Sequence, residues 1–247
     1  MLPHIHFLYL QIGPIKIYTW GFFVALGFLA ALVYVLKKYP QEKEIFIDLC
    51  LYSLLGAIIG ARIFFLLFYG DVKMLGLKDF FKIWDGGMSS LGGIFGGALA
   101  TYLYARYEEI NFYEIAQKIA FILPLGLAIG RIGCFLINDH PGIKTWTHPL
   151  SVAYPDGPRF DLGLVLFLFD TFIFIYFLFL RNRGRKKHLF LENFLIIYGA
   201  GRFLLDFLRI GEPEIAGLAP SQYGGVVLIA AGICLLVFKK DRRQVTG

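Results

Sequence analysis

Three arginines lie inside long apolar segments of the chain, each with glycine nearby: Arg62, Arg131 and Arg202. On insertion scales an arginine in the middle of a membrane helix costs roughly 2.5 to 3.5 kcal/mol, so such a residue marks a candidate functional site. A guanidinium group is planar, permanently charged and able to contact a phosphate through two parallel hydrogen bonds. These residues therefore predict a cationic site for a phosphate-bearing ligand. The alternatives are that the arginines reach the membrane surface or pair with carboxylates for structural reasons.

The composition places these segments in a membrane. Apolar residues make up 57% of the 247 residues and charged residues 17%, whereas soluble domains have about 45–50% and about 25%. Several apolar blocks exceed the ~18 residues that indicate a bilayer span. The net charge of +6 lies mostly in short loops, so it reports topology rather than nucleic-acid binding. These features exclude a soluble enzyme and predict a protein that crosses the membrane several times.

Seven apolar segments are predicted to be transmembrane helices: residues 18–36, 45–69, 88–104, 115–137, 162–180, 189–208 and 223–238. Basic residues concentrate in alternate loops, so the positive-inside rule places the N-terminus outside and the C-terminus in the cytoplasm. We expect an amphipathic surface segment at 71–84 and a polar loop at 138–160. The predicted fold class is an all-α polytopic membrane protein with seven transmembrane helices and a small outward-facing amphipathic arm and loop region. It forms a single domain over residues 1–247.

Glycines repeat at a four-residue spacing in the third predicted helix: Gly92, Gly93, Gly96 and Gly97. This spacing lets two membrane helices pack closely, so we interpret these residues as a packing surface. The three cysteines, Cys50, Cys134 and Cys234, show neither a CxxC motif nor disulfide-like spacing. The sequence indicates no metal site, no cofactor and no cleaved signal peptide.

The second, fourth and sixth predicted helices all run from inside to outside. Each carries its arginine about six to eight residues before its outer end, which is roughly 10 Å below the outer surface at 1.5 Å per residue. Three guanidiniums at one depth predict a single cationic cavity open toward the outer leaflet. Asp206, one turn after Arg202, is the expected counter-ion, and Arg209 ends the sixth helix. Asp48 and Asp170 are expected at other depths, which leaves positive charge for a phospholipid phosphate.

Four motifs carry a resemblance to a known family: Gly-Arg-Ile-Gly-Cys-Phe at 130–135, Trp-Asp-Gly-Gly-Met-Ser-Ser-Leu-Gly-Gly at 84–93, Gly-Ala-Arg at 60–62, and Tyr-Gly-Ala-Gly-Arg-Phe at 198–203. Over most of its length the chain resembles the prolipoprotein diacylglyceryl transferases. The resemblance implies a seven-helix membrane body. It also implies a reaction in which diacylglyceryl moves from phosphatidylglycerol to the lipobox cysteine of a preprolipoprotein and glycerol phosphate leaves.

The resemblance further implies roles for the site residues. Arg131 matches the family's phospholipid-binding arginine, and Arg202 matches its second essential arginine. Together with the depth of the arginines and the neighbouring glycines, this gives the residues expected to bind phospholipid: Arg62, Gly130, Arg131, Gly133, Asn138, Arg202, Asp206 and Arg209. Expected partners are phosphatidylglycerol, the preprolipoprotein signal peptide with its lipobox cysteine, and the lipid bilayer, but no nucleic acid. The expected location is the bacterial plasma (inner) membrane.

The chain departs from the family pattern mainly where a proton must be handled. Leu91 stands in place of the usual histidine of the third helix, Trp20 in place of a tyrosine, and Cys134 in place of an asparagine. The acidic residue that closes the arginine motif is present only as Asp139. Residues 159–164 represent a family patch that is normally Arg-His-Pro-Ser-Gln-Leu-Tyr-Glu. The phosphate-binding half is therefore intact and the proton-handling half is altered.

Asp139 and His140, at the cavity mouth, are candidates for the missing base, and we count them with Arg131 and Arg202 as candidate catalytic residues. Alternatively the substrate thiol loses its proton to water, because neighbouring cations depress the pKa of a cysteine. Two other functions stay open. One is a diverged member that binds or transfers phospholipid without lipidating cysteine. The other is a transporter or a retinal protein, although the last predicted helix lacks the lysine that retinal needs.

Overall fold

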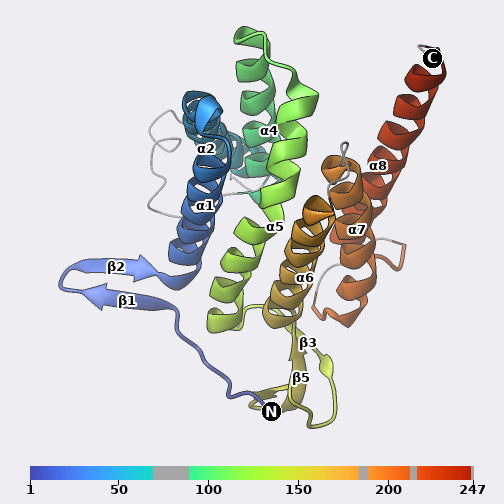
Figure 1. Cartoon of the computed structure of the whole chain (residues 1–247). Coiled ribbons are helices and arrows are strands. Elements are labelled where there is room, and N and C mark those ends of the chain that lie inside the picture. Colours follow the sequence, from blue (N-terminus) through green and yellow to red (C-terminus); the bar gives the residue numbers. More distant parts are fainter. Residues whose placement is uncertain (69–88, 184–188, 212–215, 246–247) are drawn as a thin grey trace. The chain divides into compact units, whose positions relative to one another are not determined.

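The computed structural model describes residues 1–68, 89–183, 189–211 and 216–245, and most of them are helical (Figure 1). The surface segment predicted at 71–84 lies outside these residues. Two units can each be described by itself. Unit 1 comprises Met1–Ala31 and Ala116–Gly247, and unit 2 comprises Leu32–Ile115.

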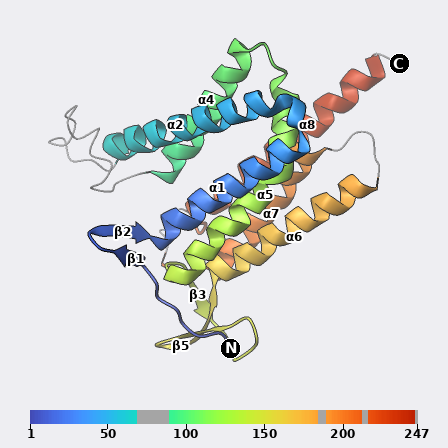
Figure 2. The same ribbon diagram turned by 60° about the vertical axis from the view of Figure 1, so that its left-hand side comes forward.

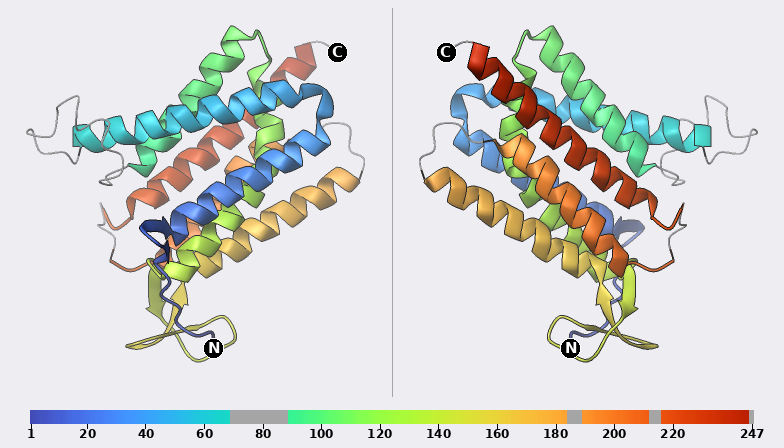
Figure 3. Two further views of the ribbon diagram at one scale, coloured as in Figure 1. Left: turned by 90° about the vertical axis from the view of Figure 1, so that its left-hand side faces the viewer. Right: turned by 90° about the vertical axis from the view of Figure 1, so that its right-hand side faces the viewer.

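Unit 2 is built on the packing of α2 (Lys43–Phe68) against α4 (Ser90–Tyr107), which lie side by side (Figure 3). A short 3-10 turn, η1 (Pro40–Glu42), precedes α2. Glycines line the contact, because a Cβ at Gly60 would lie 2.8 Å from the Cα of Gly96. That separation is shorter than real side chains tolerate, so the two helices approach as closely as small residues allow.

The glycines of α4 do not all make the same contact. A Cβ at Gly92 or Gly96 would collide with the backbone of α2. At Gly97 it would lie 3.2 Å from the carbonyl oxygen of Ser53, and at Gly93 it would make ordinary contacts of 3.6 Å. Ser89 caps the start of this helix, because its hydroxyl accepts a hydrogen bond from the Gly92 amide at 3.4 Å.

Unit 1 contains the beginning of α1, nearly all of α5 and the later helices: α1 (Thr19–Lys38), α5 (Phe112–Ile137), α6 (Leu162–Asn182), α7 (Phe190–Leu205), η4 (Asp206–Leu208) and α8 (Pro220–Val245). Helices α7 and α8 run side by side (Figure 3). They touch through Gly199 and Gly225, where a Cβ on either residue would lie 2.7 Å from the carbonyl oxygen of the other. Gly27 of α1 and Gly126 of α5 make a similar backbone contact.

Buried polar side chains fix the position of α7. Gln117 on α5 donates to Glu192 on α7 at 2.6 Å and accepts from the Leu191 amide at 3.0 Å. Gln222 on α8 donates to the carbonyl oxygen of Phe203 at 3.1 Å. An ordinary hydrogen bond contributes about 0.5–1.5 kcal/mol and one to a charged carboxylate about 1.5–3 kcal/mol, so α7 is held on both sides by contacts that depend on orientation.

The segment at 138–160 differs from the polar loop that we predicted, because it folds into a small antiparallel sheet in the order β3-β5-β4. The strands are β3 (Pro141–Lys144), β4 (Val152–Tyr154) and β5 (Gly157–Asp161). The N-terminal segment reaches this sheet (Figure 2), and the Leu2 amide donates to the carbonyl oxygen of Ser151 at 2.7 Å. A second hairpin, β1 (Tyr9–Ile12) with β2 (Ile15–Tyr18), precedes α1. The strands are too short, and the prolines too many, for alternation to have revealed the sheet.

Five helical segments in the described residues are long and apolar enough to cross a membrane: Thr19–Lys38, Pro40–Leu67, Phe112–Ile137, Leu162–Asn182 and Pro220–Phe238. They coincide with five of the seven predicted spans. The other two predicted spans, 88–104 and 189–208, correspond to α4 and α7, which are helical but are not among the five. The chain is thus a mostly helical protein with several membrane-spanning segments.

Candidate active site

The end of α5 places the charged residues of unit 1. Arg131 and Cys134 lie on one face of this helix, three residues apart. The residue after the helix, Asn138, has a left-handed backbone with φ of 47°, and its side-chain amide donates to the carbonyl oxygen of Phe135. The chain then turns, and the carbonyl oxygen of His140 accepts from the Leu162 amide at 3.0 Å. This turn directs Asp139 and His140 back toward the last turn of α5.

Arg131 is surrounded by polar groups from three helices. It interacts with the hydroxyl of Tyr198 on α7, with the thiol of Cys134 and with the carboxylate of Asp170 on α6. Asp170 is fully buried and interacts with Arg202 on α7 as well as with Arg131. Our expectation that Asp170 lies at another depth is therefore wrong, because this residue of α6 lies close enough to interact with both arginines.

Arg202 has the predicted counter-ion. Its guanidinium lies 3.1 Å from the carboxylate of Asp206, and the two side chains are 12% and 0% exposed. Asp206 begins the 3-10 turn η4, which follows α7 directly. The two arginines and the two aspartates, Asp170 and Asp206, thus form one buried charged cluster between α5, α6 and α7.

Arg209 and His140 form the other end of this cluster. A guanidinium nitrogen of Arg209 lies 3.3 Å from Nδ1 of His140, and Nε2 of His140 lies 3.6 Å from the carboxylate of Asp139. Guanidinium only donates, so Nδ1 accepts and the proton of the neutral imidazole sits on Nε2, facing Asp139. Burial lowers the pKa of His140 although Asp139 opposes the shift, so the ring is neutral at neutral pH.

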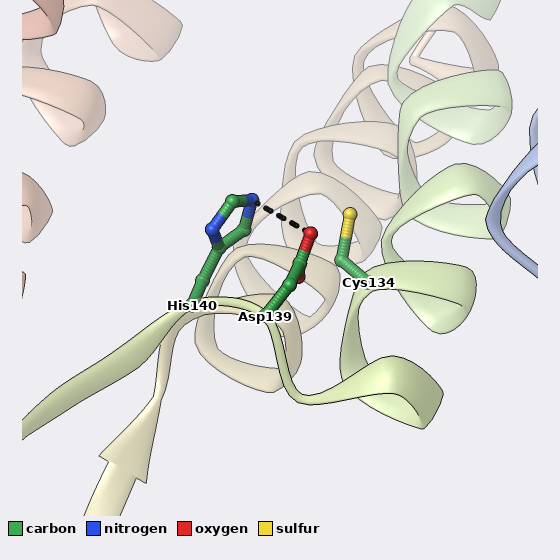
Figure 4. A group of neighbouring side chains, drawn as sticks. All are labelled: Cys134, Asp139 and His140. Carbon is green, nitrogen blue, oxygen red and sulfur yellow. Dashed lines mark ion pairs between the residues drawn. The ribbon is translucent and has the colours of Figure 1, made fainter. Parts of the chain in front are cut away.

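Cys134 lies beside Asp139 and His140 (Figure 4). One ligand atom from each residue, the sulfur, a carboxylate oxygen and a ring nitrogen, falls within 4.8 Å of the other two. The Cys134 side chain is only 4% exposed, and it also interacts with Arg131 and Trp20. Sequence reasoning treated Cys134 only as a departure from a family pattern. Its position one helical turn after Arg131 was the available signal for a place in the site.

The other predicted site residues, Gly130, Gly133 and Arg62, have packing contacts in the structure. Gly133 faces α1, since a Cβ there would lie 3.0 Å from Cβ of Phe23, and Gly130 has only an ordinary contact of 3.8 Å with Val24. Gly133 therefore allows α1 and α5 to pack closely. Arg62 is buried in α2, with its guanidinium 5.7 Å from the ring centre of Phe65. It belongs to unit 2, so the cavity shared by three arginines stays a prediction.

Residues 159–164 comprise the end of β5 and the start of α6. Arg159 pairs with Asp156 and donates to the carbonyl oxygen of Gly142 at 2.9 Å. Asp161 accepts from Tyr154 at 2.7 Å and caps α6 by accepting from the Leu164 amide at 2.9 Å. Burial raises the pKa of Asp161, although these hydrogen bonds act against the shift. These residues hold β5 and the start of α6 in place.

A buried cluster of arginines and carboxylates among apolar, span-length helices defines the class as an integral membrane protein with a charged site inside its helical bundle. The chain belongs to the prolipoprotein diacylglyceryl transferase family, whose model matches residues 8–238. It is 33% identical over 262 residues to proteins named phosphatidylglycerol–prolipoprotein diacylglyceryl transferase from Francisella tularensis subsp. mediasiatica and subsp. novicida. Each alignment covers 98% of this chain and 97% of the relative.

Proposed function

We infer that this protein transfers the diacylglyceryl group of phosphatidylglycerol to the lipobox cysteine of a preprolipoprotein and releases glycerol phosphate. The family membership and the names of the relatives support this activity. One structural observation assigns this activity to particular residues. Arg131 and Arg202, on two different helices, interact with the same buried carboxylate, that of Asp170. Two permanent cations around one point suit a phosphodiester that gains charge as it leaves.

The chemistry is an alkylation of sulfur. The thiolate attacks the glycerol carbon that bears the phosphate ester, a carbon–sulfur bond forms, and the carbon–oxygen bond breaks. The electron pair leaves with glycerol phosphate, which gains one negative charge. Arg131 and Arg202 stabilise that charge in the transition state, where a single preorganised donor contributes about 100- to 1000-fold in rate.

Phospholipid binding needs groups beyond these two arginines. We assign Arg62, Gly130, Gly133, Asn138, Asp206 and Arg209 to the phospholipid site, as the sequence predicts. Asp206 orients Arg202 through its 3.1 Å contact. Asp139 and His140 stand beside the residues that bind phosphate and are placed to act on the incoming thiol.

The protein lies in the bacterial plasma membrane with seven spans, its N-terminus outside and its C-terminus in the cytoplasm. Helices α4 and α7 are the two spans beyond the five that length and hydropathy identify. Helix α4 packs against α2, and α7 packs against α8. Both partners are span-length helices, so we place α4 and α7 in the membrane beside them. The partners are phosphatidylglycerol, the lipobox segment of a preprolipoprotein and the bilayer.

The test is release of glycerol phosphate by the purified full chain in nanodiscs that contain phosphatidylglycerol, after addition of a lipobox peptide. We expect Arg131→Ala to abolish release and to leave the helical circular dichroism intact. Arg106→Ala, at an exposed position near the end of α4, is the matched control and should keep the wild-type rate. Absence of release by the wild-type protein with any anionic phospholipid would rule the activity out.

A second candidate is a member that binds or moves phospholipid without lipidating cysteine. The leucine at position 91, where the family usually has histidine, favours it. This candidate predicts lipid binding with an unmodified peptide. Mass spectrometry of the peptide after incubation decides between the two, because lipidation adds the mass of one diacylglyceryl group.

A further inference from the structure

The β1–β2 hairpin separates its side chains into two chemically different faces. The strands pair antiparallel, with Leu10 opposite Ile17 and Gln11 opposite Lys16. Neighbouring side chains along a strand point to opposite faces, and residues directly opposite one another share a face. One face is therefore aliphatic and carries Leu10, Ile12 and Ile17. The other face is polar and aromatic and carries Tyr9, Gln11, Lys16 and Tyr18.

The aliphatic face of the hairpin is exposed. Leu10, Ile12 and Ile17 are 48%, 58% and 37% exposed. In Figure 1 and in Figure 2 the hairpin extends sideways from the start of α1, away from α5 and α6. A two-stranded hairpin whose apolar face meets water is at best marginally stable. The hairpin therefore needs a surface that covers this face.

The polar face carries residues that proteins place at the level of lipid headgroups. The ring centres of Tyr9 and Tyr18 lie 6.1 Å apart, and the ammonium group of Lys16 lies 5.0 Å from the ring centre of Tyr9. Tyrosine and tryptophan concentrate where hydrocarbon meets water, and a lysine at that level is attracted to anionic phosphates. Trp20, exposed in the first turn of α1, adds another such residue beside the hairpin. A lipid leaflet, with its apolar interior and charged boundary, matches both faces.

The hairpin lies where a membrane span begins. Tyr18 ends β2 and Thr19 begins α1, which is long and apolar enough to cross a membrane. The Thr19 amide donates to the carbonyl oxygen of Leu8 at 3.0 Å, so the hydrogen-bond ladder of the hairpin continues into the first turn of the helix. The hairpin is thus attached at the level where the chain enters the bilayer.

The backbone limits how deeply the hairpin can enter lipid. Among the described residues, β1 and β2 pair only with each other, so each strand has one open edge. Open sheet edges do not occur in the hydrocarbon region, because their backbone groups find no hydrogen-bond partners there. Each strand has four residues, fewer than the about 9–11 that a spanning strand needs. The hairpin therefore lies flat, with its backbone among the headgroups and its aliphatic side chains among the acyl chains.

The base of the hairpin is fixed to the helix that carries the candidate site. Phe7, two residues before β1, donates its amide to the carbonyl oxygen of Leu136 at 2.9 Å. Leu136 lies in the last turn of α5, shortly before Asp139 in the chain. The depth of the hairpin in the membrane and the depth of this end of α5 are therefore coupled.

We propose that the β1–β2 hairpin is a membrane-binding element that lies in the lipid–water interface at the start of α1. Leu10, Ile12 and Ile17 enter the acyl chains, and the polar face meets the headgroups and water. Through the hydrogen bond of Phe7 to Leu136, the hairpin holds the end of α5 at the depth of the lipid phosphates. This last step rests on the proposed function, in which the site must reach the phosphate of phosphatidylglycerol.

Spin labels at four consecutive residues of β1 test the orientation of the hairpin. The full chain with Cys50→Ala and Cys234→Ser retains only the buried Cys134. In this background, nanodiscs of phosphatidylcholine and phosphatidylglycerol receive four singly labelled variants: Tyr9→Cys, Leu10→Cys, Gln11→Cys and Ile12→Cys. We expect collisions with oxygen, which concentrates in lipid, to dominate at positions 10 and 12. Collisions with a water-soluble nickel chelate should dominate at positions 9 and 11.

The alternation supplies its own control, because adjacent labels share the same fold, lipid and labelling chemistry. Nickel collisions that dominate at all four positions would place the hairpin in water and overturn the proposal. Weak collisions with both reagents at positions 10 and 12 would mean that protein, either a second copy or another part of this chain, covers the face. That result would overturn the proposal as well. Unchanged helical circular dichroism verifies that each labelled variant is folded.

The role of the hairpin in transfer is read separately from its contact with lipid. Ile12→Asp and Gln11→Asp add the same charge to adjacent residues on opposite faces of the hairpin. Ile12→Asp should slow release of glycerol phosphate by about 10- to 100-fold, because a displacement of ~1 Å far from the chemistry can cost about 100-fold. Gln11→Asp should keep the wild-type rate. Equal rates for the two variants would overturn the link to α5. If the labels alternate but the wild type releases no glycerol phosphate, the membrane contact stands and the proposed function fails.

Discussion

Asp170 determines how much positive charge the site can offer to a phosphate. It is fully buried and interacts with both Arg131 and Arg202, while neither of its carboxylate oxygens has a hydrogen-bond partner among the described residues. A carboxylate left without hydrogen bonds between two guanidiniums is a poor structural ion pair, since buried pairs need good geometry to repay desolvation. It is better suited to offset the repulsion between the two arginines until a phosphate takes over that role.

Asp170→Asn should therefore reduce stability and increase the effect of lipid. Removing one partner of a buried charge cluster costs about 3–5 kcal/mol, because the two guanidiniums then repel each other without compensation. Phosphatidylglycerol should recover part of this loss through binding to the folded state. Thermal unfolding in detergent, with and without the lipid, measures both effects.

The control for this prediction is Asp48→Asn. Asp48 accepts from the Tyr104 hydroxyl at 3.1 Å, and an asparagine oxygen can accept the same bond. It should change Tm little and show the same response to lipid as the wild type. Equal Tm values and lipid responses for Asp170→Asn and wild type would mean that Asp170 does not govern the arginines.

At the scale of single elements, the sequence predicted the positions of the helices far better than it predicted the contacts between side chains of different helices. Apolar length predicted the five span-length helices, and the i, i+4 spacing predicted the ion pair of Arg202 with Asp206. The sheet at 141–161 was missed because its strands have three to five residues. The approach of Asp170 to Arg131 was missed because it depends on how α5 and α6 are rotated about their axes, which no pattern within one helix specifies.

The contact between α7 and α8 gives a test at this scale. A Cβ at Gly225 would lie 2.7 Å from the carbonyl oxygen of Gly199, whereas a Cβ at Gly224 would meet nothing within 4 Å. Gly225→Ala should lower stability by about 1–3 kcal/mol through overpacking. Gly224→Ala, one residue away, should raise it slightly, because alanine is the better helix former by about 0.5–1 kcal/mol. Thermal unfolding of the two variants measures the difference, and equal shifts of either sign would contradict the packing assigned here.

The cap of α6 should show a pH dependence of defined sign. Burial raises the pKa of Asp161 above its usual value, so the folded state holds this proton more tightly than the unfolded state. The resulting stability is fully present below the unfolded pKa of about 3.9 and is lost as pH rises through the folded pKa. Asparagine cannot ionise and caps helices equally well. The Tm of the wild type minus that of Asp161→Asn should therefore fall as pH rises from 4 toward neutrality, and a difference that rises instead would reverse the sign assigned to Asp161.

At the scale of the whole molecule, the number of spans decides on which side of the membrane the chemistry occurs. With the N-terminus outside, the seven predicted spans place the segment after α5, including His140, outside. If only the five span-length helices crossed, α4 would not reverse the chain and the same segment would face the cytoplasm. Both arrangements leave the C-terminus inside, since five and seven are both odd. The C-terminus therefore carries no information on this question, although its basic residues fit the positive-inside rule.

Reporters inserted at two internal positions separate these arrangements. Alkaline phosphatase, which is active only outside the cytoplasm, should be active after Thr147, in the loop between β3 and β4 that follows α5. Inserted after Arg183, which follows α6, it should be inactive, and a green fluorescent protein there should fluoresce. The five-span arrangement gives the opposite result at both positions. Without a crossing at α4, every segment from α5 to α7 changes sides, and the omission of α7 restores the original side only after that helix. A reversed pattern would also remove the lipobox chemistry from the outer face, since Asp139 and His140 follow α5 directly and share its exit side.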